Sequence, residues 1–228
     1  MAIRLEKGQK INLEKNNGTK LTQFCVGCNW GAVTKKVLFG LSSSVVDVDL
    51  DLSCILFDKN GNMVDHIWSP LYRFSNNSLN LPNGKLDTRD GALHHTGDDL
   101  TGDTGGDDGL DNEVITVDLD KVNPNVESIV FFLNIYNNNE YQGDFSGIPY
   151  AYIRMFEPTM RNGQITGVKE NFAQYDVSTK TDCVGMRGLI LGKLYRRNGE
   201  WKFAAIGDAF PDKSIVNTIS RVINSYNK

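Results

Sequence analysis

Short runs of β-branched and aromatic residues, separated by polar turn residues, recur along most of the chain, which is the pattern of β-strands. Asn-Gly dipeptides, typical of tight hairpin turns, separate pairs of such runs at 60–61, 162–163 and 198–199, most clearly between 189–195 and 201–206. We expect further strands, rich in β-branched and aromatic residues, near 21–28, 45–57, 63–67, 113–119, 128–136, 150–156 and 170–177. The pattern therefore predicts a chain built mainly of β-strands.

Only the C-terminal segment has the periodicity of a helix. Ile215, Ile219, Val222, Ile223 and Tyr226 recur at helical spacing and predict an amphipathic helix at about 212–226. Many short strands followed by one helix indicate an all-β fold, a two-sheet β-sandwich with long Asp/Gly-rich loops on which the helix packs. At 228 residues we expect a single domain spanning 1–228.

The acidic residues are concentrated in one segment. The formal net charge is only -4, yet ten Asp and Glu residues and no Lys or Arg lie between Asp90 and Asp120. The remaining 18 acids stand against all 24 basic residues, so the rest of the chain carries +6. A strongly acidic segment repels phosphate backbones, and we therefore expect no nucleic-acid partner.

The densest part of this segment runs from His95 to Glu113 and holds seven carboxylates and five glycines. Two carboxylates at about 4 Å repel each other by about 1 kcal/mol in water, and by several times that near a protein surface. Because the segment contains no basic side chain, a bound cation is the economical compensation. Calcium fits best, since it takes six to eight oxygen ligands in adaptable geometry, whereas zinc and copper prefer His or Cys. A solvated, mobile acidic loop is the alternative.

A second acidic element lies upstream, where Asp47, Asp49 and Asp51 alternate with aliphatic residues. In a continuous strand this alternation places the three carboxylates on one face. Known calcium motifs do not match: an EF-hand that starts at Asp47 would need glycine at Leu52, and the Gly-rich β-roll repeat is absent. A site must therefore be assembled from separate segments.

Five separated motifs resemble the TerD-type tellurium-resistance proteins, in that family's order along nearly the whole chain. They are Asp47–Ser53, Phe74–Asn77, His95–Asp98, Gly106–Asp108 and the closing pair Leu194–Arg196 and Gly199–Phe203. The resemblance implies a β-sandwich that holds two calcium ions where these loops meet. It carries the ligand role to Asp49, Asp51, Asn76, Asn77, Asp98, Asp107, Asp108 and Glu113, with the backbone carbonyl of Gly97.

Two points of the implied site stay open. The family usually has Glu directly after Gly-Asp-Asp, whereas here Gly109–Asn112 intervene, so that either Asp111 or Glu113 could close the site. His95 matches the family's loop histidine, as a ligand or as an orienting residue.

The resemblance also implies a function, that of a calcium-binding stress-response protein associated with tellurite or oxidative stress or with phage resistance. It would act as a calcium-dependent binding or scaffold module, not an enzyme, with calcium and either other tellurium-resistance proteins or further copies of itself as partners. Two alternatives remain: a metal-dependent hydrolase that uses the acidic site, and an assembly component whose acidic loop contacts a basic partner directly. No Gly-x-Ser-x-Gly, P-loop or His-Glu-x-x-His motif is present.

The remaining signals concern location and cysteine chemistry. The N-terminal residues include no apolar signal-peptide core, and no stretch approaches the roughly 18 apolar residues of a membrane span, so we expect a cytoplasmic protein without stable membrane insertion. Cys25 and Cys28 have redox or zinc spacing, but no second ligand pair accompanies them. We expect two thiols in or beside a strand; a role in handling oxidising tellurium species is the alternative.

Overall fold

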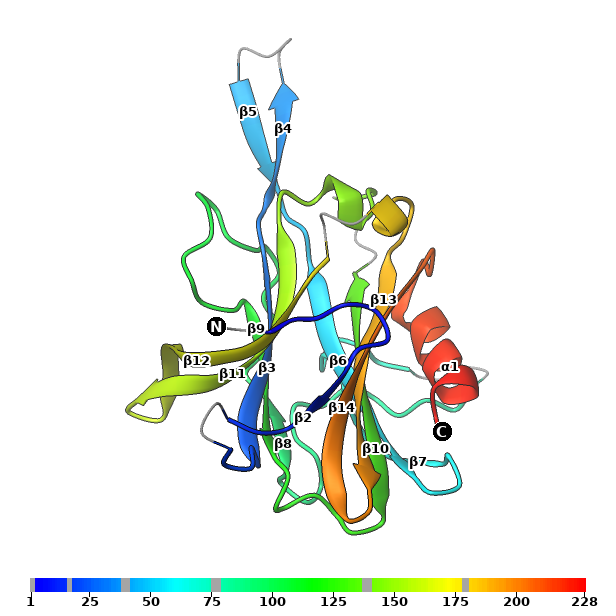
Figure 1. Ribbon diagram of the computed structural model, residues 1–228. Helices are drawn as coiled ribbons and strands as arrows, with labels where there is room; N and C mark the ends of the chain where they lie inside the picture. The colour runs from blue at the N-terminus through cyan, green and yellow to red at the C-terminus, as the bar shows by residue number, and fades with distance from the viewer. Residues whose placement is uncertain (1–2, 16–17, 38–41, 75–78, 137–140, 178–180) are drawn as a thin grey trace.

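Two six-stranded sheets pack face to face in the computed structural model, which describes residues 3–15, 18–37, 42–74, 79–136, 141–177 and 181–228 (Figure 1). Sheet A has the strand order β1 (Ile3–Arg4), β12 (Gln164–Asp176), β11 (Ala151–Arg161), β3 (Gln23–Trp30), β9 (Glu113–Asp118) and β8 (Leu93–His95). Sheet B has the order β2 (Lys10–Asn12), β14 (Glu200–Phe210), β13 (Gly188–Arg197), β10 (Val126–Ile135), β6 (Leu50–Asp58) and β7 (Met63–Ile67). The predicted β-sandwich is confirmed.

The core lies between the sheets and extends onto the outer face of sheet B. In β6, Leu52, Cys54 and Leu56 face the core between the sheets, while Ile55 and Phe57 face the helix side. Because both faces of this strand are covered, all its residues except the last are buried. A strand that is buried on both faces lies in the interior of the fold.

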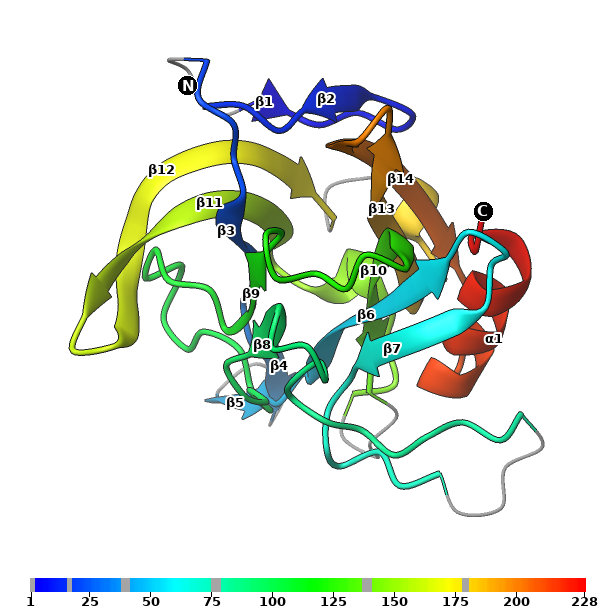
Figure 2. The same ribbon diagram turned by 90° about the horizontal axis from the view of Figure 1, so that it is seen from below.

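The predicted helix is present as α1 (Ile215–Ser225), which begins three residues later than expected. Its buried face carries Ile215, Ile219 and Val222, which pack on the outer face of sheet B (Figure 2). Two short 3-10 turns, η2 (Phe145–Gly147) and η3 (Thr181–Cys183), complete the helical content of the described residues. Within those residues, no helix combines the length and apolar character that crossing a membrane requires.

The predicted hairpins form, with two kinds of turn. Asn162 and Asn198 have positive φ angles of 52° and 54°, and the glycines that follow them have 80° and 78°. Positive φ angles at both central residues are typical of the type I′ turn, whose backbone twist matches that of the paired strands. The Asn60-Gly61 turn differs, because only Gly61 has a positive φ angle. In this turn Asp58 accepts hydrogen bonds from the backbone N–H groups of Asn60 and Asn62.

The predicted strand at 45–57 is wrong in its first part. The chain forms a separate hairpin of β4 (Val33–Val37) and β5 (Ser42–Val46), which projects from one end of the sandwich, and enters sheet B only at Leu50 (Figure 1). Asp47 therefore lies in neither strand, and the three acids form no continuous exposed row. Asp51 does lie on the face opposite Leu50 and Leu52, but that face is buried.

Two other elements differ from the expectation. No strand was expected at β8, which at three residues is too short to stand out in the sequence and which pairs with β9. The hairpin of β11 and β12 is longer than predicted. Its far part is polar and more exposed, so it lacks the apolar alternation that identifies a half-buried strand.

Candidate metal centre

Three carboxylates from two separate segments meet beside the start of β6. Asp49 lies just before β6, Asp51 lies within it, and Asp98 follows β8 on the long loop. One oxygen of each lies within 4.8 Å of the others. Asp49 and Asp51 are only 4% and 2% exposed. We call these three residues the first acidic group.

Glu113, the first residue of β9, lies beside this group and is fully buried. Its Oε2 accepts a hydrogen bond of 2.6 Å from the backbone N–H of Leu52. Burial raises the pKa of Glu113 well above its usual range, opposed by the Leu52 N–H and reinforced by the charges of Asp98 and Asp49. Burial also raises the pKa values of Asp49, to about 7, and of Asp51, and neighbouring carboxylates add to both shifts.

The polar contacts of the first acidic group leave two of its oxygens without a donor. The hydroxyl of Tyr72 donates to Asp51 at 2.5 Å, and that of Ser69 donates to Asp98 at 3.0 Å. The buried Oδ1 atoms of Asp49 and Asp98 find no hydrogen-bond donor among the described residues. Buried polar atoms are almost always satisfied, so these two oxygens are candidate ligand atoms.

His95 is close to the first acidic group but is not arranged as a cation. Burial lowers the pKa of His95 to about 4, so the ring is neutral near pH 7. Its Nδ1 accepts the N–H of Gly97 at 3.1 Å, which places the ring proton on Nε2, 3.4 Å from Glu113 Oε2. This geometry fits the orienting role of His95 rather than ligation.

A second acidic group lies further along the same loop and consists of Asp103, Asp107 and Asp108, whose oxygens also lie within 4.8 Å of one another. This group is more exposed than the first. Side chains of β3, of β11 and of the residue just before β11 donate hydrogen bonds to it. The contacts are Tyr150 Oη to Asp103 at 2.7 Å, Asn29 Nδ2 to Asp107 at 3.1 Å and Tyr152 Oη to Asp107 at 3.1 Å.

Asp111 belongs to neither acidic group. Nε of Arg154 lies 3.0 Å from both of its carboxylate oxygens, and the side chains of Asp111 and Arg154 are 1% and 9% exposed. Arg154 is 43 residues away in sequence, so the acidic segment receives a basic partner that its own composition does not contain. The guanidinium of Arg154 thus compensates the charge of Asp111. Of the two residues left open above, Glu113 is the one that lies beside the first acidic group.

Asn112 connects the surroundings of the two groups. Its side-chain amide donates to Asp103 Oδ1 at 3.2 Å and lies 3.5 Å from Asp99 Oδ2, while its own oxygen accepts the N–H of Trp30 at 2.8 Å. The backbone N–H of Asp99 in turn reaches Glu113 Oε1 at 3.4 Å. A short chain of hydrogen bonds thus joins the two halves of the loop.

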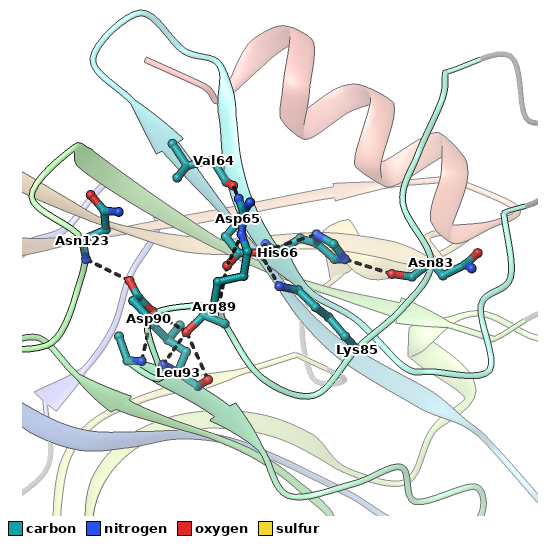
Figure 3. A network of polar contacts seen from close by, with 11 residues as sticks. Val64, Asp65, His66, Asn83, Lys85, Arg89, Asp90, Leu93 and Asn123 are labelled. Carbon is teal, nitrogen blue, oxygen red and sulfur yellow. Dashed lines mark hydrogen bonds and ion pairs between the residues drawn. The ribbon is translucent and has the colours of Figure 1, made fainter.

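The earlier part of the long loop is anchored to the edge strand β7 by a charged network (Figure 3). Asp65 accepts from the ammonium group of Lys85 and, at 2.8 Å, from the backbone N–H of Arg89, whose guanidinium reaches the carbonyl of Val64. His66 contacts the carbonyl of Asn83 at 3.0 Å. The network ties residues 83–89 to sheet B and so fixes the segment that leads to β8 and Asp98.

The structure thus brings together only part of the ligand set that the resemblance implies. Asp49, Asp51 and Asp98 meet with Glu113 beside them, whereas Asp107 and Asp108 lie in a second group with Asp103. Gly97 directly precedes Asp98 with a φ of 125°. Asn76 and Asn77 lie outside the described residues.

Sequence reasoning missed several residues of the site. Asp103 was visible as one of the crowded acids, but nothing in its spacing set it apart. The other contributors, for which no local signal exists, are Asn29, Ser69, Tyr72, Asn112, Tyr150, Tyr152 and Arg154.

Cys25 and Cys28, the two cysteines of the Cys-x-x-Cys pattern, lie in different environments. Cys25 packs with Val114 and Phe156 in a small cluster, and Cys28 is part of the core between the sheets. Both are thiols, and burial raises the pKa of each, to about 12 for Cys25. Residues three apart in a strand face opposite sides, so the pair is arranged neither for a disulfide nor for a shared metal.

Comparison with known proteins gives one consistent result. The family model described as TerD domain matches residues 1–220. The chain is 34% identical to stress response protein SCP2 of Bacillus subtilis (strain 168), covering 98% of this chain and 100% of that protein. It is 30% identical to tellurium resistance protein TerZ of Serratia marcescens, covering 98% of each.

Solved structures agree at the level of the fold. A crystal structure of a homologue of telluride resistance protein (TerD) from Streptomyces coelicolor A3(2) superposes with a TM-score of 0.58 at 12% identity, covering 91% of this chain and 98% of that one. At this identity the likeness shows the sandwich architecture alone.

Proposed function

Because the chain belongs to the TerD domain family, whose curated relatives include tellurium resistance and stress response proteins, we propose that it is a calcium-binding stress-response protein. In this proposal, bound calcium neutralises the two acidic groups and orders the loop that carries them. The ordered loop then serves as a calcium-dependent binding or scaffold surface.

The observation that carries the proposal is the pair of buried carboxylate oxygens, Asp49 Oδ1 and Asp98 Oδ1, which find no donor among the described residues. No Lys or Arg among those residues forms an ion pair with Asp49, Asp51 or Asp98. A divalent cation would satisfy the oxygens and remove the repulsion together.

The donor set favours calcium over other cations. Both acidic groups offer carboxylate oxygens and no thiolate, and the one nearby imidazole, of His95, is already engaged at Nδ1. Hard oxygen ligands suit calcium and magnesium, and calcium tolerates the irregular geometry of a glycine-rich loop better. Two separate groups support two ions, one for each. Asp49, Asp51 and Asp98, with Glu113 nearby, would hold one ion, and Asp103, Asp107 and Asp108 the other.

The proposed role is a binding role and not a catalytic one. Two of the three carboxylates of the first acidic group, those of Asp49 and Asp51, are buried and that of Asp98 is half-buried, which leaves a substrate little access to an ion there. The partners we propose are other proteins of the tellurium-resistance type or further copies of this chain, in the cytoplasm. Sedimentation with and without calcium would report self-association, which we expect to differ between the two states.

Calorimetric titration with calcium tests the proposal directly. We expect two binding events in the wild-type chain, loss of one in the double variant D49N/D98N and loss of the other in D107N/D108N. D120N is the matched control, because Asp120 is an exposed acid of the same charged segment that lies in neither group. Absence of heat and of any thermal stabilisation at millimolar calcium would refute the calcium proposal.

A further inference from the structure

Arg154 lies in the middle of β11 and is 8% exposed. Its guanidinium binds both oxygens of Asp111 through Nε and, through Nη2, the backbone carbonyl of Gly109 at 2.8 Å. The same group lies over the rings of Tyr152 and Phe156, with its carbon 5.4 Å and 5.3 Å from their centroids. Residues two apart share one face of a strand, so the two rings flank the arginine and hold it in place.

Gly27 on the neighbouring strand β3 makes room for this contact. It pairs with Arg154 across the two strands, and a Cβ atom added to Gly27 would lie only 2.5 Å from the carboxylate of Asp111. Asp111 can therefore sit directly on the sheet, next to Arg154. Two features therefore hold the loop at Asp111: Gly27 leaves the space that the carboxylate occupies, and the guanidinium of Arg154 binds it from the side.

The pinned segment immediately follows the carboxylates of the second acidic group. Asp107 and Asp108 come just before Gly109, whose carbonyl Arg154 holds, and Asp107 also accepts from Tyr152, the neighbour of Arg154 on β11. We infer that Arg154 is a positioning residue, which latches Asp111 and Gly109 and so presets Asp103, Asp107 and Asp108 for one cation. This inference rests on the proposed calcium binding and assigns Asp111 to the latch, not to the ion.

The bonds of Arg154 go to Asp111 and to the Gly109 carbonyl, so the latch would act by ordering the loop. Without it, calcium would have to order the loop while binding, which weakens the apparent affinity. Partners that orient metal ligands are typically worth about 10- to 100-fold in metal affinity. Lysine can replace the arginine only in part, because it keeps the charge but has one compact ammonium group rather than several directed donors.

The test is a calcium titration in a D49N/D98N background, where only the second acidic group is left to bind. We expect R154M to weaken this binding by about 10- to 100-fold, R154K to weaken it less, and K169M, which removes an exposed charge from the adjacent strand β12, to leave it unchanged. In the D107N/D108N background, R154M should leave calcium binding to the first acidic group unaltered. An R154M protein with normal second-group affinity would overturn the inference.

A double-mutant cycle separates the latch from direct ligation by Asp111. If Asp111 acts only through Arg154, D111N/R154M binds calcium no more weakly than R154M alone. Additive losses would make Asp111 a ligand and overturn the assignment.

Hydrogen exchange of the calcium-free protein supplies a readout that needs no metal. R154M should raise the exchange of the Gly109 and Leu110 amides, and unchanged exchange would count against the latch. If the wild-type chain binds no calcium at all, the proposed function fails and the inference falls with it. Normal wild-type binding that R154M does not alter defeats the inference alone.

Discussion

The backbone N–H of Leu52, on sheet B, donates a 2.6 Å hydrogen bond to the buried carboxylate of Glu113, on sheet A. This bond links the two sheets at the place where the first acidic group gathers. A charged acceptor inside the sandwich is expensive to bury, as the raised pKa of Glu113 indicates. The contact couples the packing of the two sheets to the charge state of the site.

Replacing Glu113 with glutamine tests this coupling. Because E113Q keeps the acceptor for the Leu52 N–H and removes the buried charge, we expect the calcium-free protein to melt at a higher temperature than wild type. The melting-temperature increase caused by calcium should shrink. At free calcium about a hundredfold above the dissociation constant, one site is worth about 2.7 kcal/mol of stabilisation. Thermal melts with and without calcium measure both effects, with D120N as the control; a calcium shift equal to that of wild type would contradict the prediction.

The pH dependence of stability should reverse when calcium is added. Burial raises the pKa of Asp49 to about 7 and moves the pKa values of Asp51 and Glu113 upward as well. Between the unfolded values of about 4 and these raised values, the folded calcium-free protein binds more protons than the unfolded chain. Its free energy of unfolding therefore increases as the pH falls from about 8 toward 5.

With calcium present, protons compete with the ion for the same carboxylates, so the calcium stabilisation should be lost over the same pH range. Denaturant unfolding at a series of pH values, in calcium-free buffer and at saturating calcium, measures the two slopes. Equal slopes in the two buffers would show that protons and calcium do not compete for the buried carboxylates.

Asn112 should couple the two acidic groups. Because its side chain bonds Asp103 and lies near Asp99, whose N–H reaches Glu113, N112A is expected to weaken calcium binding at both groups. The cost should be about tenfold at each, by analogy with other residues that orient metal ligands. Titrations of N112A in the D49N/D98N and D107N/D108N backgrounds separate the two effects. An effect confined to the second group would remove Asn112 as the link.

The thiols of Cys25, Cys28 and Cys54 should react slowly in the native protein. All three are buried, and burial raises the pKa of each thiol, whereas the thiolate is the reactive form. Alkylation followed by peptide mass spectrometry should find these positions unmodified until the protein is unfolded. Rapid labelling of Cys25 or Cys28 under native conditions would revive a thiol role in oxidant handling.

The docking of α1 should contribute strongly to stability. Ile219 is fully buried against the outer face of sheet B, so I219A is expected to cost about 2–5 kcal/mol through lost burial and the cavity that remains. S225A, at an exposed position of the same helix, is the control. Urea unfolding measures both variants, and a loss below about 1 kcal/mol for I219A would indicate that the helix is loosely attached.

Local sequence determined the parts of this protein that local physics controls. The strand-like runs at 63–67 and 113–118, the Asn-Gly turns and the spacing of Ile215, Ile219 and Val222 each form the predicted element, because strand propensity, periodicity and turn propensity act over a few residues. The crowding of acids between Asp90 and Asp120 likewise identified the candidate site from composition. The sequence did not show that the 45–57 run divides into two strands. The first part pairs with β4 and the second with β10, and this change of partner before Leu50 leaves no mark in an alternating pattern.

Only the tertiary structure decided how the charges are distributed. Whether an acid joins the first group, joins the second or pairs with a basic residue depends on which strand edges lie beneath the loop. Arg154 reaches Asp111 across 43 residues, and Tyr72 reaches Asp51 across 21. Sequence reasoning therefore assumed that the acidic segment had no basic partner, whereas the packing of β3 beside β11 supplies one. Electrostatic energy depends on distance in space, and the fold sets that distance.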